Sequence, residues 1–125
     1  MKGESEAKPL DLRERSFSFA LRVVKLCQNL DTERGVSRAL SHQLLRAGTS
    51  IGANIEEAHA SQSKADFTAK LSIACKEARE THYWLRLLAA AEVIHEKRLH
   101  DLTDEASQLV AILTTVVKKC RRPAA

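Results

Sequence analysis

Residues 40–58 read LSHQLLRAGTSIGANIEEA, and this stretch decides the fold. Apolar residues recur every three or four positions along it, which places them on one face of an α-helix and not on alternate faces of a strand. The stretch contains no proline, the strongest helix breaker. The sequence therefore predicts an amphipathic helix whose core stripe is Leu40, Leu44, Ala47, Ile51, Ile55 and Ala58.

Three further segments show the same periodicity, and polar connections near residues 31–35, 60–63 and 95–97 separate the four. Ser63 followed by Asp66 is a capping box with Asp in place of Glu, and it marks the start of the third helix. The expected core stripes are Phe17, Ala20, Leu21, Val24 and Cys27 in the first helix, Phe67, Leu71, Ala74, Ala78, Thr81, Leu85 and Leu88 in the third, and Leu102, Ala106, Leu109, Leu113, Val116 and Cys120 in the fourth.

Short connections make consecutive helices antiparallel neighbours, and apolar steps of three and four are typical of helices packed at a shallow angle. The sequence thus predicts an all-α protein, an antiparallel up-and-down four-helix bundle that is oligomeric. A chain of 125 residues fits one domain. We expect that bundle domain at residues 11–120, a disordered N-terminal segment at residues 1–10, and a basic C-terminal tail at residues 121–125.

A second apolar stripe on the first helix, and apolar positions outside the core stripe of the third, suggest burial by another copy of the chain. The alternative is that these residues widen the core of a monomer. In the second helix two glycines four residues apart create a flank with almost no side chains, where another helix can come close. The interface candidates are Phe19, Val23, Leu26, Leu30, Gly48, Gly52, Ile73, Trp84 and Leu87.

Charge suggests a second kind of partner. The net charge is +4, and four cations near the C-terminus account for it, because 16 basic and 16 acidic residues remain without them. Such a cluster can contact phosphates, and a second helix without acids between Glu33 and Glu56 could add a basic stripe. The alternative is a solvated face with cations at a helix end. The candidate RNA or DNA contacts are Arg38, Arg46, Lys118, Lys119, Arg121 and Arg122.

Two Glu-x-x-His sequences, Glu56 to His59 and Glu92 to His95, have the spacing that di-iron carboxylate bundles use. Both pairs fall near the C-terminal ends of consecutive antiparallel helices, so they would lie at opposite ends of the bundle. No glycine-rich phosphate loop or nucleophile elbow occurs. The sequence therefore predicts a non-enzymatic protein with no metal, no cofactor and no small-molecule substrate.

The sequence also indicates a compartment. The first residues, MKGESEAKPLDLRER, contain no apolar core of a signal peptide, and no later apolar run approaches about 18 residues. We expect a cytoplasmic protein without a membrane partner. An odd number of widely spaced cysteines fits a reducing compartment, and each lies in an apolar helical pattern. These cysteines are Cys27, Cys75 and Cys120.

The runs RAGTSIGANIEEA at residues 46–58, SKADF at 63–67 and KEARETHYWLRLL at 76–88 resemble the bacterial four helix bundle protein family. Its founding members are encoded by intervening sequences in large-subunit ribosomal RNA genes. The resemblance implies an up-and-down bundle that forms a homopentamer without known enzymatic activity. Gly52 and Ala58 depart from the family's frequent Pro and Gly. The polar positions that match the family motif are Ser50, Asn54, Glu57 and Glu80, which we expect to form a polar seam at helix or subunit contacts.

Overall fold

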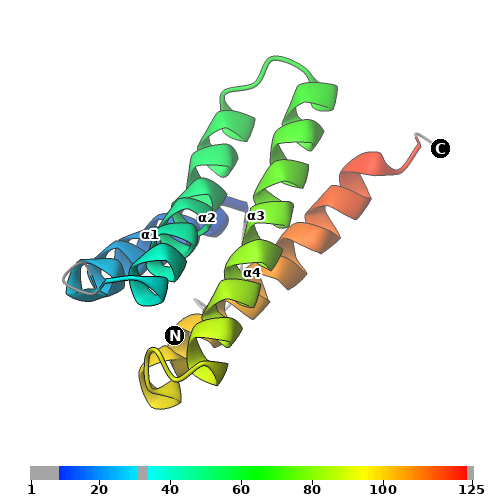
Figure 1. Ribbon diagram of the computed structural model, residues 1–125. Helices are drawn as coiled ribbons and strands as arrows, with labels where there is room; N and C mark the ends of the chain where they lie inside the picture. The colour runs from blue at the N-terminus through cyan, green and yellow to red at the C-terminus, as the bar shows by residue number, and fades with distance from the viewer. Residues whose placement is uncertain (1–8, 31–33, 124–125) are drawn as a thin grey trace, which may run out of the picture.

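The computed structural model describes residues 9–30 and 34–123, and in them it contains four helices and no strand (Figure 1). The helices are α1 (Pro9–Leu30), α2 (Val36–His59), α3 (Lys64–Ala90) and α4 (Glu96–Arg121). The prediction of an all-α fold is confirmed. Helix α1 begins within the N-terminal segment that was expected to be disordered, and residues 1–8 of that segment lie outside the described residues. So do residues 124–125 of the expected tail.

Each helix packs against the next one along the chain, and α1 also meets α4 over a smaller area. In Figure 1, α2, α3 and α4 lie side by side, while α1 packs against α2. Hydrogen bonds from one arginine of α1 link the first helix to the last. Arg15 donates from Nε and Nη2 to the Glu105 carboxylate at 2.9 and 2.8 Å, and from Nη2 to Gln108 Oε1 at 2.9 Å.

The core stripes predicted for α2, α3 and α4 are largely confirmed. Every predicted α2 position is buried except Leu40, and every α3 position except Phe67; these two residues are half-buried. In α4 the buried stripe advances by four residues from Leu113 to Val117, so Val117 is buried in place of the predicted Val116, and Cys120 is half-buried. The side chains that fill the centre include Leu44, Ile51, Ile55, Leu71, Leu85, Leu88, Leu109 and Leu113.

The prediction for α1 reversed its two apolar faces. Phe17 and Leu21, expected in the core, are 70% and 47% exposed, whereas Phe19 is only 1% exposed. Of the predicted core stripe only Cys27 is buried. Four of the positions that face the core are Leu12, Phe19, Val23 and Leu30, with Leu26 half-buried against it. Phe19, Val23 and Leu30 are therefore core residues of one chain and not contacts between copies.

The glycine flank of α2 explains which face of α1 turns inward. A Cβ atom built on Gly48 would lie 3.0 Å from both methyl carbons of Val23, and one on Gly52 would lie 3.3 Å from Ser16 Oγ. Since side chains four residues apart share a helix face, Phe19 turns inward with Val23. The prediction that the flank admits a close helix is right. Its assignment to another copy is wrong, because the helix is α1 of the same chain.

The connection between α3 and α4 covers residues 91–95, earlier than the predicted residues 95–97. The Val93 amide donates to the Leu88 carbonyl at 3.0 Å and the Glu92 amide to the Ala89 carbonyl at 3.1 Å. This pattern is a Schellman motif, and it places Glu92 in the left-handed region at φ 59°. His95 then caps α4, because its Nδ1 accepts from the Lys97 amide at 3.1 Å. At the start of α3, Ser63 Oγ accepts from the Asp66 amide as predicted, at 3.0 Å.

Replacing Glu92 with glycine should raise the free energy of unfolding by about 0.5–1 kcal/mol, since glycine adopts a left-handed conformation without the steric cost of a Cβ atom. Urea denaturation followed by circular dichroism measures this difference. The matched control is Ala91→Gly, because Ala91 has right-handed helical angles and gains nothing from the change. A stabilisation of equal size in both variants would contradict the explanation.

Candidate interaction surfaces

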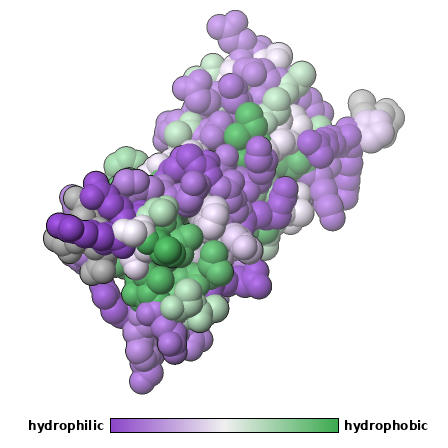
Figure 2. Space-filling view, in the orientation of Figure 1, coloured by the Kyte–Doolittle hydropathy of each residue, from purple (hydrophilic) through white to green (hydrophobic). Residues whose placement is uncertain are grey.

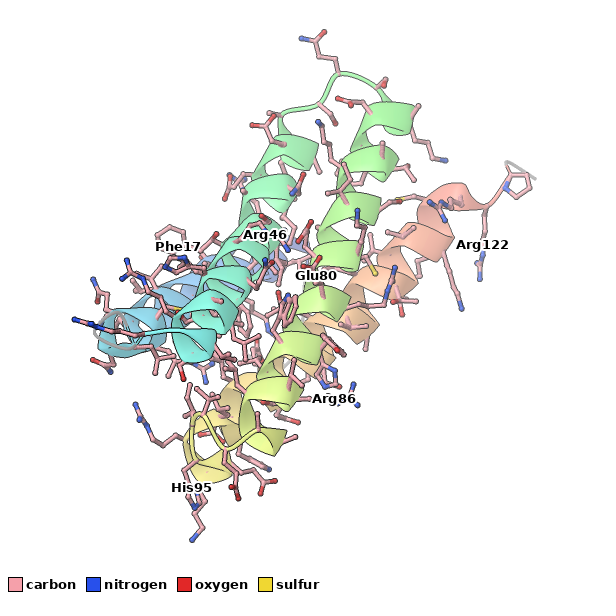
Figure 3. The ribbon with its side chains drawn as sticks, viewed as in Figure 1. Phe17, Arg46, Glu80, Arg86, His95 and Arg122 are labelled. Atoms are coloured by element: carbon pink, nitrogen blue, oxygen red, sulfur yellow. The ribbon has the colours of Figure 1, made fainter. Side chains whose placement is uncertain are left out.

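Helix α1 has a second apolar face that points away from the core. We call it the outward stripe, and it consists of Phe17, Ala20, Leu21 and Val24. The first and third of these are exposed, and the other two are half-buried. Figure 3 shows Phe17 at the side of α1 next to α2. One turn before it, Arg13 donates to Glu56 of α2 at 2.7 Å, and this hydrogen bond lowers the pKa of the Glu56 carboxyl. The ion pair links α1 to α2, and the described residues leave Phe17 and Leu21 of the outward stripe exposed.

The interface candidates on α3 keep part of their surface free. Ile73 is 41% exposed, and Leu87 is half-buried. Trp84 is half-buried against the core, and its ring N–H donates to Glu80 Oε2 at 3.1 Å. Figure 2 shows hydrophobic side chains gathered where α2 begins and α3 ends, the region that contains exposed Val36.

The predicted polar seam bonds mainly within its own helix. Ser50 Oγ donates to the Arg46 carbonyl at 2.7 Å, and Asn54 Nδ2 donates to the Ser50 carbonyl at 2.8 Å. Glu57 is exposed. Glu80 bonds across helices, because it accepts from Arg46 of α2. These bonds account for Ser50, Asn54 and Glu80 within the protein.

Arg46 was predicted to contact nucleic acid, but two carboxylates of α3 already hold it. Its Nη1 lies 3.3 Å from Glu77 Oε1, and its Nη2 is paired with Glu80. Since a paired guanidinium must give up carboxylates before it binds a phosphate, Arg46 is a poor phosphate contact. Arg38 is exposed on the same helix. Figure 3 places Arg46 at the middle of the molecule and Arg122 beyond the end of α4, so the two predicted basic groups do not form one surface.

A basic residue that sequence reasoning did not select, Arg79, lies on the same seam between α3 and α4 as Arg121 of the C-terminal cluster. Arg79 of α3 donates to Cys75 Sγ at 3.2 Å, and Cys75 Sγ lies 3.4 Å from Thr114 Oγ1 of α4. Closer to the end of α4, Arg121 Nη2 donates to Ser72 Oγ at 3.0 Å. Arg79 therefore shares the α3–α4 seam with the last turns of α4. Only the register between the two helices, which no local motif encodes, brings them together.

An open groove of about 600 Å³ lies between the end of α3 and the start of α4. Arg86 and His82 line one wall, and burial together with the charge of Arg86 lowers the pKa of His82. Glu96 and Asp104 line the other wall. The groove thus mixes both signs of charge, and it has no clear preference for an anion or a cation.

The Glu-x-x-His residues have local structural partners. Glu56 pairs with Arg13, and His59 Nδ1 lies 3.0 Å from the Ile55 carbonyl with its ring edge-on to Phe67. In the part of the chain that the structure describes, no group of three His, Cys, Asp or Glu side chains could hold a metal ion. Burial raises the pKa of the Cys27 thiol to about 11, which keeps this sulfur protonated and a weak nucleophile.

Among the helices of the described ranges, none is both long and apolar enough to cross a bilayer. The model of the 23S rRNA-intervening sequence protein family matches residues 8–115. A crystal structure of a protein of unknown function from the S23 ribosomal protein family of Bacteroides thetaiotaomicron superimposes with a TM-score of 0.79. It shares 42% sequence identity, over 86% of this chain and 98% of that one. No curated protein matches the chain.

Proposed function

The chain belongs to the 23S rRNA-intervening sequence protein family, and on this premise we propose that it is a non-enzymatic homo-oligomer, a pentamer of antiparallel up-and-down bundles that binds or scaffolds a partner. The family's biochemical function is unknown, and its solved relative is likewise of unknown function. The number five comes from the family resemblance. The short connections and the packing of consecutive helices support the antiparallel order.

The observation that carries the proposal is the outward stripe of α1. Helix α1 already buries one apolar face against its own chain, and a second apolar face with Phe17 and Leu21 remains open to solvent. Burying a fully exposed large apolar side chain contributes about 1.5–3 kcal/mol, so covering Phe17 and Leu21 would contribute part of the free energy of a subunit contact. A helix that is apolar on both sides is typical of an element covered on both sides. A second copy of the chain can supply the cover.

Light scattering coupled to size exclusion tests the assembly directly. The expected mass is close to five times the 13.9 kDa of one chain. A mass of one chain would contradict the oligomer, and a stable dimer or tetramer would contradict the number five alone.

Replacing Phe17 with aspartate should dissociate the oligomer, because each subunit contact would then bury a charge without a partner. We expect the mass measured by light scattering to fall to that of one chain, while the circular dichroism spectrum keeps its helical content. Val36→Asp is the control, since Val36 is also apolar and as exposed as Phe17 but lies at the start of α2. If Val36→Asp dissociates the protein and Phe17→Asp does not, the interface lies at the start of α2 instead.

A further inference from the structure

Charge is distributed unevenly along the α3–α4 pair. Residues 64–79 and 106–122 together carry eight Lys or Arg and two acidic residues, a net charge of +6. The whole chain carries +4, so the rest of the molecule has a net charge of −2. We call these two ranges the basic end. A concentration of one sign at one end creates a local positive potential that the net charge of the protein understates.

Hydrogen bonds across the seam show that the two halves of the basic end are adjacent. Ser72 accepts from Arg121, and Cys75 lies against Thr114, as described above. Lys118 is one turn beyond Thr114 on the same face of α4, and Arg79 is one turn beyond Cys75 on α3. Figure 1 shows the start of α3 and the end of α4 together at one end of the molecule. Arg79, Lys118 and Arg121 are therefore spread along one seam of the pair, with Arg121 at the level of Ser72 and Arg79 on the other side of the contact between Cys75 and Thr114.

Among the side chains that the structure describes, in residues 12–30 and 34–123, no ion pair involves any of these three cations. Helix α4 contains no acid after Glu105, and one of the two acids of the basic end, Glu77, is held by Arg46 on the α2 side of α3. Arg79, Lys118 and Arg121 are exposed, so their charges are available to an external anion.

We propose that the basic end binds the phosphodiester backbone of a nucleic acid, with Arg79, Lys118 and Arg121 at the centre of the contact. Guanidinium groups bind phosphate oxygens in a bidentate manner, and several cations on one face can follow successive phosphates. An anionic lipid surface fits less well, because a helix that lies on a membrane inserts an apolar face. Across the described residues of the basic end, Ile73 is the one large apolar side chain that is exposed, and a single side chain does not make an inserting face. The proposal stands independently of the oligomer.

The test is fluorescence anisotropy with a labelled single-stranded RNA, its duplex and the corresponding DNAs, titrated at several KCl concentrations. Binding should weaken as salt rises, and the three-fold variant R79A/K118A/R121A should flatten the slope of log K against log salt by about 2–3. This value follows from a slope of about 0.7–0.9 for each phosphate that the variant no longer neutralises. Comparing the four probes shows whether RNA or DNA, single or double strand, is preferred.

The control variant, R22A/K25A/R98A, removes the same charge from exposed positions on α1 and at the start of α4, outside the basic end. It should keep the slope of the unmodified protein. If the salt slope decreased equally in both variants, the effect would come from net charge alone, and the proposal would be overturned. The absence of binding at the lowest salt would also overturn it. Vesicles containing phosphatidylserine are the third arm, and binding to them without binding to any nucleic acid would also overturn it. Light scattering confirms that both variants keep the assembly of the unmodified protein.

Discussion

Replacing Phe19 with alanine should lower the free energy of unfolding by about 3–5 kcal/mol, the usual cost of removing a large aromatic ring from a core. Phe19 is almost completely buried, and it is one of the largest fully buried side chains of the protein. Its removal leaves a cavity that α1, held close to α2 at the two glycines, cannot collapse freely to fill. Urea denaturation at equilibrium measures the decrease.

Phe17→Ala is the matched control, because it removes the same side chain two residues away on the same helix. Phe17 is mostly exposed, so its removal should change the stability of the single chain by less than about 0.5 kcal/mol. If the outward stripe is a subunit contact, the cost of Phe17→Ala should grow as protein concentration rises, whereas the cost of Phe19→Ala should not. A larger cost for Phe17→Ala at low concentration would show that the faces of α1 are assigned incorrectly.

These two phenylalanines mark the limit of what periodicity could predict. Helices α2, α3 and α4 each have a dominant apolar stripe, so hydrophobic spacing predicted most of their core. Helix α1 has two stripes of comparable hydrophobicity, and spacing alone cannot say which one faces inward. The deciding feature is on another helix, where Gly48 faces Val23. The glycine pair was visible in the sequence, but its partner was not.

The candidate sites were predicted less well than the fold, because charge in a sequence does not reveal its partners. Arg46 appeared free on a helix without nearby acids, yet Glu77 and Glu80 reach it from α3. Conversely, Arg79 is separated from Arg121 by more than forty positions in the sequence, and the α3–α4 register places them on one seam. Such a register depends on how long the helices are and where their connection falls. The connection was misplaced because Glu92, not glycine, occupies the left-handed position.

The close approach of α1 and α2 leads to the other large effect. Gly48→Leu should lower the free energy of unfolding by about 3 kcal/mol or more, because even the first added carbon would lie 3.0 Å from two methyl carbons of Val23. Leucine has a higher helix propensity than glycine, but this difference stabilises the protein by only about 1 kcal/mol. The change should also weaken the Arg13–Glu56 and Arg15–Glu105 ion pairs, since both require α1 in its present place.

Ala53→Leu is the control for this change, because Ala53 lies on the exposed face of the same helix and has room for a larger side chain. It should alter stability by less than about 0.5 kcal/mol. A double-mutant cycle with the smaller change Gly48→Ala then identifies the contact itself. Val23→Ala removes the two methyl groups that crowd the new Cβ atom, so the two changes together should cost less than the sum of their separate costs, by about 0.5–3 kcal/mol. Strict additivity would mean that Gly48 is required for some reason other than its contact with Val23.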